Sequence, residues 1–284
     1  MSMMPLTARL EDLIANYDVF LIDQFGVLRD DIGAYPGAPP ALAALKKAGK
    51  VVIILSNSGR SGDYNADRLV ALGFERSSFD RFVTSGDVAY EILSQDLTLI
   101  RGRTRCLTIS SGGDTNLADR LGLTTVDDAF DADVVVISGS EAERISLEDY
   151  RALLRPAAEK NAPCYCTNPD IHKLAGGTVA PGAGSLAKLY EELGGAVKWL
   201  GKPHSEIYHY ARSVLSLTPS ERIVCIGDSI EHDIVGATNA GLPSALVETG
   251  IMSGLSSSMI RGLLDQFDVT PTYLLERFGL VAEQ

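Results

Sequence analysis

The sequence predicts an α/β protein with a doubly wound parallel-sheet core and a second α/β domain inserted into that core. First, short apolar runs alternate with amphipathic stretches along the 284 residues. This alternation is typical of strand–helix repeats that build a parallel sheet covered on both faces. Second, polar residues gather where the apolar runs end. Third, most of these polar ends lie in two segments that flank the middle of the chain.

The expected strands are short and rich in Val and Ile, as strands buried on both faces of a sheet usually are. They cover residues 18–23, 50–56, 105–110, 133–138, 163–168, 223–228 and 244–248. Amphipathic helices are expected between them, for example over residues 38–48 and 141–160.

The inserted domain is expected over residues 86–177, because this segment carries a strand–helix pattern of its own. Residues 1–85 and 178–284 would then form one discontinuous core domain. The length of the chain fits two domains of ordinary size.

Composition and charge exclude several classes of partner. The formal net charge is -12, which argues against nucleic acid, whose binders need clustered Lys and Arg. No run approaches the roughly 20 apolar residues that span a bilayer, and the N-terminus lacks the apolar block of a secretion signal. We therefore expect a cytoplasmic protein without a membrane partner, and its assembly into a homo-oligomer stays open.

The four cysteines lie in apolar, strand-like runs and form no C-x-x-C pair. Free cysteine packs as a small apolar residue, and cytoplasmic thiols are kept reduced. We expect buried, reduced thiols at Cys106, Cys164, Cys166 and Cys225.

Polar residues at two strand ends and before one helix could bind an anion. Asp23 is followed by a glycine turn, which exposes the carboxylate and lets backbone N–H groups approach a ligand. Ser56 and Asn57 are expected to open a helix, whose N-terminus attracts anions. Lys202 stands before a helix that Pro203 can start, where it could pair with a phosphate and a carboxylate. Turns, N-caps and solvated lysines place the same residue types at such positions.

A further strand end carries two acids. Asp228 ends a very apolar run, and Asp233 follows within about one helical turn. Two carboxylates near one strand tip suit a hard cation with oxygen ligands, such as Mg²⁺. Helix capping explains one of these acids more easily than both.

The order and spacing of these motifs resemble the four-motif pattern of the haloacid dehalogenase superfamily. Three further segments resemble its NagD-type branch, subclass IIA: CTNPD at 166–170, PGAGSLAKLYEELGG at 181–195 and GKPHSEIY at 201–208. Together they cover nearly the whole chain. The resemblance implies a Rossmann-like core and an inserted cap domain that determines substrate specificity. About 145 residues separate Ser56 from Lys202, whereas the roughly 30 between Asp23 and Ser56 are too few for a domain.

The resemblance also implies roles in phosphoryl transfer. Asp23 would be the nucleophile that forms an aspartyl-phosphate. Ser56, Asn57 and Lys202 would hold the phosphate, and Lys202 would also orient the nucleophile. His172, just after a strand of the cap, is a candidate for substrate contact.

The implied cofactor is Mg²⁺. Asp23, Asp228 and the backbone carbonyl of Phe25 would hold the ion, with Asp233 in support. One departure from the family pattern concerns Phe25. The family's phosphatases usually have a second Asp two residues after the nucleophile, and this Asp is the general acid and base. Losing such a group typically costs about a hundredfold to ten-thousandfold in rate.

The favoured function is therefore Mg²⁺-dependent hydrolysis of a phosphate monoester of a small metabolite, such as a sugar phosphate or a nucleotide-like compound. Haloacid hydrolysis also tolerates an aromatic residue at this position, but it needs no metal acids. Phosphonate cleavage would need a special cap lysine, for which only Lys160 and Lys173 are available. A catalytically weak protein that binds a phosphorylated metabolite is the remaining alternative.

Overall fold

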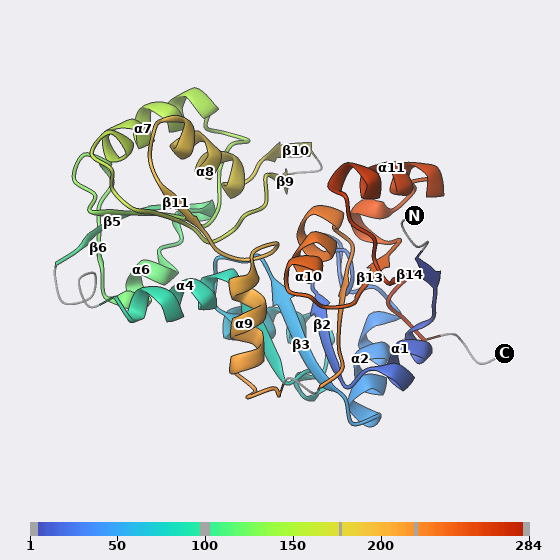
Figure 1. Ribbon diagram of the computed structural model, residues 1–284. Coiled ribbons are helices and arrows are strands. Elements are labelled where there is room, and N and C mark those ends of the chain that lie inside the picture. The colour runs from blue at the N-terminus through green and yellow to red at the C-terminus, as the bar shows by residue number, and fades with distance from the viewer. Residues whose placement is uncertain (1–4, 97–102, 176–177, 219–220, 281–284) are drawn as a thin grey trace. The chain divides into compact units, whose positions relative to one another are not determined.

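The structure is a computed structural model that describes residues 5–96, 103–175, 178–218 and 221–280 (Figure 1). The chain forms two compact units. The first contains the chain up to Ser56, the segment Gly62–Val83 and the chain from Lys202 onward, and the second contains Asn57–Ser61 and Thr84–Gly201. None of the described helices is both long enough and apolar enough to cross a membrane.

The first unit is built on a seven-stranded sheet with the order β1-β14-β13-β12-β2-β3-β4. Strand β2 lies near its centre and pairs in parallel with both β3 and β12. The strands are β1 (Leu6–Thr7), β2 (Val19–Asp23), β3 (Val51–Ser56), β4 (Arg81–Thr84), β12 (Ile223–Gly227), β13 (Ser244–Val247) and β14 (Tyr273–Leu275).

Both faces of this sheet are covered, because successive side chains of a strand point to opposite faces. Ala245 and Val247 of β13 lie in one apolar cluster, and Leu246 lies in another. The helices of this unit are α1 (Leu10–Asn16), α2 (Ala38–Lys47), α3 (Gly62–Ala71), α9 (Ser205–Ser213), α10 (Val235–Asn239) and α11 (Ser257–Phe267). Short helical turns are η1 (Arg76–Ser78), the π-turn η3 (Ile230–Ile234) and η4 (Gly250–Met252).

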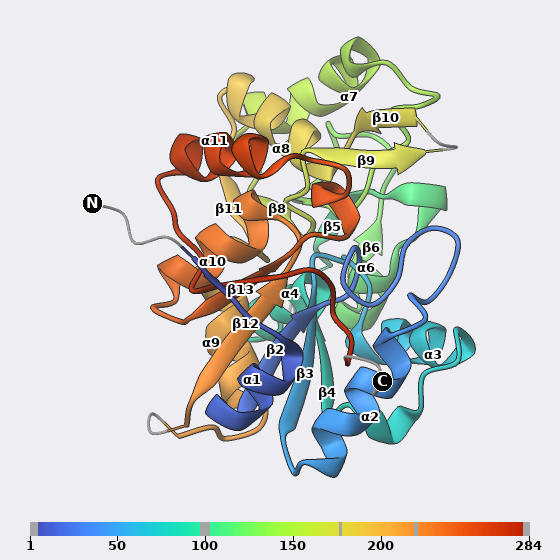
Figure 2. The same ribbon diagram turned by 90° about the vertical axis from the view of Figure 1, so that its right-hand side faces the viewer.

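The direction of winding reverses between β2 and β12. From β2 the chain proceeds through β3 to β4 on one side, and from β12 it proceeds through β13 to β14 on the other (Figure 2). This reversal defines a doubly wound sheet, and ligands bind such sheets at the carboxyl ends of the strands beside the reversal. Asp23 ends β2 and Asp228 directly follows β12. The α/β fold class expected from the sequence is confirmed.

The second unit has a five-stranded parallel sheet with the order β11-β8-β7-β5-β6 and a separate hairpin. The sheet consists of β5 (Arg105–Ile109), β6 (Thr124–Thr125), β7 (Val134–Ile137), β8 (Cys164–Cys166) and β11 (Val197–Trp199), and the hairpin of β9 (His172–Ala175) and β10 (Thr178–Pro181). Its helices are α4 (Ser85–Ser94), α6 (Asn116–Leu121), α7 (Leu147–Glu159) and α8 (Ala183–Glu192), with the short turn η2 (Ser111–Gly113).

The second unit reaches further along the chain than the expected boundary at residue 177. It continues to Gly201, because β11 pairs with β8 and the buried face of α8 joins the core of this unit. The sequence prediction assigned these residues to the core domain, because the strand–helix pattern of the insertion was expected to end at residue 177. Strand pairing over a distance in sequence decides the boundary instead.

Two helix starts also differ from expectation. The helix expected directly after Ser56 begins at Gly62, and residues 57–61 form a loop within the second unit. The helix expected from residue 141 begins at Leu147, because the Ser146 side chain accepts a hydrogen bond from the backbone N–H of Asp149 and caps the helix there.

Candidate active site

Four charged residues converge at the sheet reversal of the first unit. The Lys202 ammonium donates to Asp23 Oδ1 at 2.5 Å and to Asp233 Oδ1 at 2.7 Å. Asp23 and Lys202 are only 9% and 3% exposed, and Asp228 and Asp233 are also buried. Burial of such charges is energetically costly unless they are paired. The cluster is therefore a specific, buried arrangement and not a group of solvated surface residues.

The two acids after β12 are held by backbone N–H groups. Ser229 donates its N–H to Asp233 Oδ2 at 3.0 Å, within the turn that opens η3. Ile251 donates its N–H to Asp228 Oδ2 at 2.8 Å from the turn after β13. These bonds fix one oxygen of each carboxylate and so set the direction in which the other oxygen points.

Glycines allow the three loops to approach each other closely. Gly26 has a φ of +83°, and a Cβ added there would lie 2.0 Å from Asp228 Oδ2. Gly250 has a φ of +60°, and its Cβ would lie 1.9 Å from the same atom. The Thr249 hydroxyl donates to the Gly26 carbonyl at 2.6 Å and ties the loop after β2 to the loop after β13.

Sequence reasoning missed the contribution of Thr249 and Gly250. The available signal was their position directly after the apolar run 244–248, which is a further strand end of the same sheet. Neither residue carries a charged side chain, so this strand end has no electrostatic signal in the sequence.

Burial and mutual repulsion set the charge state of the acids. Burial raises the pKa of Asp23 well above its usual range, and the Lys202 ammonium opposes that shift. Burial, together with the Asp233 carboxylate, raises the pKa of Asp228 to about 7. Burial acts to lower the pKa of Lys202, but the carboxylates of Asp23 and Asp233 outweigh it and raise this pKa. The lysine is therefore a fixed positive charge.

The donor set fits a hard divalent cation. Carboxylate oxygens of Asp23, Asp228 and Asp233 all lie within 4.8 Å of one another. Three acids face a single buried ammonium, which leaves negative charge uncompensated when all three are ionised. Oxygen donors at this density are what Mg²⁺ binds in proteins, and a bound cation would offset the repulsion that raises the pKa of Asp228.

Phe25 has a side chain that is 42% exposed. Its backbone forms a bridge with Arg29, and the Arg29 guanidinium lies 5.3 Å from the centre of its ring. An aromatic ring therefore occupies the position two residues after Asp23, and it offers no proton for transfer.

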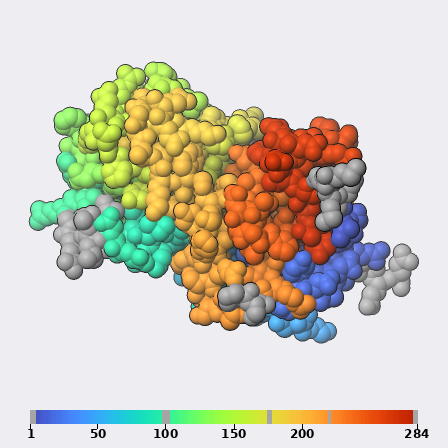
Figure 3. Space-filling view, in the orientation of Figure 1, coloured from blue at the N-terminus to red at the C-terminus, as the bar shows by residue number. Residues whose placement is uncertain are grey.

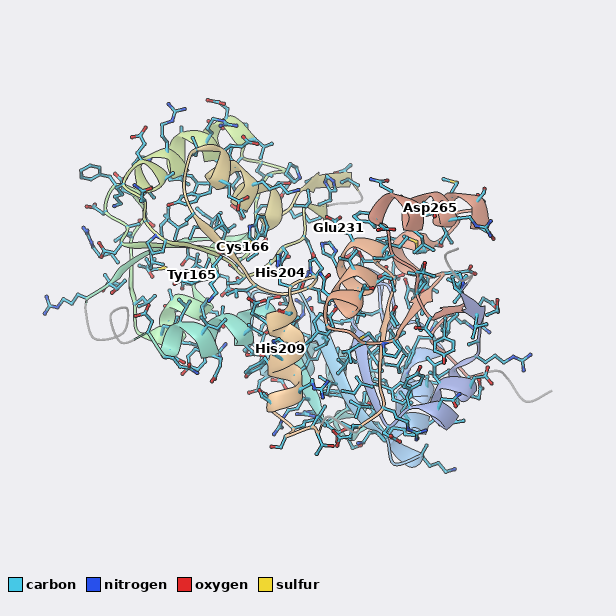
Figure 4. The ribbon with its side chains drawn as sticks, viewed as in Figure 1. Tyr165, Cys166, His204, His209, Glu231 and Asp265 are labelled. Carbon is cyan, nitrogen blue, oxygen red and sulfur yellow. The ribbon has the colours of Figure 1, made fainter. Side chains whose placement is uncertain are left out.

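The remaining expected site residues are not members of this four-residue cluster. Ser56 ends β3 in the first unit. Asn57 belongs to the second unit, where its amide donates to Asp170 Oδ1 at 2.8 Å and accepts from the Ser85 hydroxyl at 3.3 Å. His172 begins β9 of the second unit with an exposed side chain. The cluster in the first unit thus unites Asp23, Lys202, Asp228 and Asp233 but includes neither Asn57 nor His172. Figure 4 shows the side chains on both units, with His204 and Glu231 labelled near the carboxyl-end loops of the first unit.

Two family patterns match the chain. Residues 20–124 match the family described as haloacid dehalogenase-like hydrolase. Residues 199–278 match a second, related pattern described as HAD-hydrolase-like. The two matched segments contain all four members of the buried cluster.

Curated relatives span nearly the same length. Chronophin from Bos taurus is 28% identical over 290 residues, which cover 97% of this chain and 96% of the relative. The ribonucleotide monophosphatase NagD of Escherichia coli (strain K12) is 26% identical over 235 residues, covering 82% of this chain and 88% of the relative.

Solved structures give the same result. A haloacid dehalogenase-like hydrolase from Brucella suis 1330 has a TM-score of 0.79 and 31% identity, over 97% of this chain and all of that chain. A glycerol phosphate phosphatase from Mycobacterium tuberculosis, solved in complex with magnesium, has a TM-score of 0.73 and 26% identity, over 94% of this chain and 77% of that chain. The chain belongs to the haloacid dehalogenase-like hydrolases, in the NagD-like branch of subclass IIA. It is an enzyme of the hydrolase class.

Proposed function

We propose that this protein is a Mg²⁺-dependent phosphatase that hydrolyses a phosphate monoester of a small metabolite through an aspartyl-phosphate on Asp23. The observation that carries the proposal is the buried cluster in which Lys202 bonds to both Asp23 and Asp233. The Asp228 carboxylate lies beside these groups. Phosphoryl transfer requires mainly positioning and charge stabilisation, and this cluster supplies both.

Lys202 prepares the nucleophile in this proposal. Its ammonium binds Asp23 Oδ1, which favours the ionised carboxylate and leaves the second oxygen for attack on phosphorus. The bond from that oxygen to phosphorus forms as the ester P–O bond breaks, and the leaving oxygen takes the electron pair. Water then attacks the phosphorus of the aspartyl-phosphate, and the bond between phosphorus and the Asp23 oxygen breaks, which regenerates the carboxylate and releases inorganic phosphate.

Asp23, Asp228 and the Phe25 carbonyl would hold Mg²⁺, with Asp233 in support through Lys202. The ion would supply positive charge against the phosphate oxygens. Asp233 contacts Lys202 directly, so in this proposal it keeps the ammonium aligned between the two carboxylates.

The second unit would be the cap that determines specificity. We propose that it excludes water from the site and that His172 contacts the substrate. Ser56 would hold the phosphate with its hydroxyl. Asn57 would contribute its backbone N–H, because its side-chain amide already bonds to Asp170 and Ser85.

The activities named for the relatives support small phosphorylated substrates. One is a ribonucleotide monophosphatase and another a glycerol phosphate phosphatase. These names describe those proteins, and they define the range in which a substrate for this chain should be sought: phosphorylated nucleosides, sugars and polyols.

Phe25 favours a second candidate, a protein that binds a phosphorylated metabolite and turns it over slowly. A phenyl ring in place of the general acid slows the release of poor leaving groups most. Haloacid hydrolysis is disfavoured, because a metal-free reaction has no use for the acids at positions 228 and 233.

A substrate panel tests the proposal. Purified protein should release phosphate from at least one phosphorylated metabolite, and chelation of Mg²⁺ with EDTA should abolish this release. Asp23→Asn should reduce turnover at least about a thousandfold, as expected for loss of a nucleophile. Asp265→Asn is the matched control, since Asp265 is an exposed acid on α11. Chloride release from 2-haloacids without metal, and no phosphate release, would overturn the proposal.

A further inference from the structure

A hydrogen-bond network within the second unit surrounds the Asn57 side chain. Its amide Nδ2 donates to Asp170 Oδ1 at 2.8 Å, and its Oδ1 accepts from the Ser85 hydroxyl at 3.3 Å. Asn57 is 7% exposed, and Ser85 is fully buried. A carboxylate only accepts hydrogen bonds, so the NH₂ group must face Asp170 and the amide oxygen must face Ser85. The plane of the Asn57 amide is therefore fixed from both sides.

Asp170 is itself held in place by the start of helix α8. Its carbonyl accepts the N–H of Gly184 at 2.9 Å, and a Cβ added at Gly182 would lie 2.2 Å from the same carbonyl oxygen. The segments 166–170 and 181–195, which both resemble the NagD-type branch, thus meet at this acid. Helix α8 (gold) lies on the face of the second unit that Figure 3 shows. Asp170 is therefore a fixed acceptor for the Asn57 amide.

The last residue of the second unit, Gly201, packs directly on this network. It has a φ of +106°, and a Cβ added there would lie 2.1 Å from Ser85 Oγ and 2.7 Å from Asn57 Oδ1. Only glycine adopts this conformation readily and leaves room for both atoms. The backbone at Gly201 and the side chains of Asn57 and Ser85 therefore fix one another, although these residues lie far apart in sequence.

Two residues of the proposed phosphate site are joined covalently to this network. Ser56 directly precedes Asn57, and Lys202 directly follows Gly201. Because the peptide bond is planar, the orientation of one residue constrains the next. A change in the Asn57 contacts should therefore displace both Ser56 and Lys202. A misplacement of about 1 Å in an active site can cost about a hundredfold in rate.

We propose that Asp170 and Ser85 are positioning residues for phosphoryl transfer and that they act through the side chain of Asn57. The inference rests on the proposed phosphatase function and adds two residues to it that act on the backbone and not on the substrate. Asp170 keeps the backbone N–H of Asn57 directed at the phosphate. The pair of Asn57 and Ser85 supports Gly201 and so determines where the chain presents Lys202.

An exchange of the two paired side chains tests the proposal. Asn57→Asp places a second carboxylate against that of Asp170 and should lower kcat for the best monoester of the substrate panel at least about a hundredfold. The double variant Asn57→Asp/Asp170→Asn restores one donor and one acceptor across the same contact, and the Ser85 hydroxyl still has an oxygen to which it can donate. It should recover at least about tenfold in kcat, the factor expected for a hydrogen bond to a charged group.

Binding of inorganic phosphate separates positioning from a general loss of structure. In calorimetry with Mg²⁺ present, the Kd for phosphate should rise about tenfold or more in Asn57→Asp and return toward the wild-type value in the double variant. Asn161→Asp/Asp127→Asn is the matched control, because it exchanges the same residue types at two exposed positions of the second unit. It should leave kcat and the phosphate Kd within about twofold.

A milder pair of variants decides the question if thermal unfolding shows that Asn57→Asp does not fold. Asp170→Asn keeps an oxygen that can accept from Asn57 Nδ2, whereas Asp170→Ala leaves that buried donor without its acceptor. The alanine variant should lose at least about tenfold in kcat, and the asparagine variant should keep most of it.

The outcomes separate this inference from the proposed function. Wild-type kcat in Asn57→Asp, or no recovery of kcat in a folded double variant, would overturn the positioning role and leave the phosphatase function standing. Equal kcat in Asp170→Ala and Asp170→Asn would overturn it as well. If the wild type releases phosphate from no monoester of the panel, the phosphatase function itself fails, and the Kd for inorganic phosphate in the same variants still decides the positioning role.

Discussion

At the residue scale, Phe25 distinguishes two requirements of a phosphatase site that are usually met together: attack on phosphorus and protonation of the leaving group. The proposed nucleophile Asp23 is buried together with Lys202 and the acids proposed to bind the metal. The position two residues later holds a ring that cannot protonate a leaving oxygen. Binding and attack on phosphorus should therefore be intact, while departure of the leaving group should depend strongly on its own acidity.

Replacing Phe25 with Asp tests this separation. Phe25→Asp should raise kcat about tenfold or more on an alkyl phosphate and change it little on 4-nitrophenyl phosphate, whose leaving group needs no proton. Phe25→Asn is the control, since it has the size of Asp without a titratable group. Equal effects of Asp and Asn would show that proton transfer is not what the wild type lacks.

At the element scale, the site residues lie at the ends of neighbouring strands. They can lie close together because the backbones of the loops that follow these strands approach each other closely. The turn after β2 crosses directly over the Asp228 carboxylate, and only a residue without a side chain fits there. A comparable turn at the end of α2 contains Gly49, which also has a positive φ but lies in open space.

These two turns form a matched pair. Gly49→Ala should lower the free energy of unfolding by about 1–2 kcal/mol, the usual strain of a left-handed residue, and leave activity unchanged. Gly26→Ala should cost more stability and also abolish most activity, because its Cβ would collide with Asp228 Oδ2. Chemical denaturation and kcat/KM measure the two effects. If the two variants lose equal stability and keep equal activity, the close approach at Gly26 is not required.

Strands also enclose the thiols. All four cysteines are buried in β5, β8 and β12. Burial raises the pKa of Cys106 to about 11 and that of Cys166 to about 12, so thiolate is scarce at pH 8.

The native protein should therefore not react with a disulfide reagent such as DTNB within minutes at pH 8. All four thiols should react after unfolding in guanidinium chloride. Rapid labelling of one thiol in the native protein would show that its strand opens or that its burial is incomplete.

At the scale of the whole molecule, the site lowers the stability of the metal-free fold. Folding raises the pKa of Asp228 from 3.8 to about 7, so the folded state holds its proton more tightly than the unfolded chain. The stabilising contribution of Asp228 to the fold is thus fully present below about pH 4 and is lost as the pH rises through about 7. Above that pH the ionised cluster opposes folding, and a cation bound as proposed would offset this effect.

Thermal unfolding at pH 8 should show the stability that the metal-free protein loses through repulsion between these carboxylates. Without metal, Asp228→Asn should have a higher Tm than the wild type, because it removes one of three repelling carboxylates. Saturating Mg²⁺, at about 100 times its Kd, should add about 2.7 kcal/mol to the wild type, or several degrees in Tm for a chain of this size. It should add much less to the variant. A metal-free variant less stable than the wild type would contradict the repulsion argument.

The sequence by itself determined the fold class, the positions of seven strands and the four charged residues of the cluster. It could do so because apolar runs and their polar ends are local patterns, and strands of one parallel sheet must align their carboxyl ends. The resemblance to a family added the roles.

Only the tertiary structure decided how far the second unit extends and which atoms meet. The pairing of β11 with β8 and the bond from Thr249 to Gly26 join residues far apart in sequence. No periodicity encodes such pairings, because they depend on how separate elements pack. The raised pKa of Asp228 has the same origin, since burial and neighbouring charge exist only once the chain has folded.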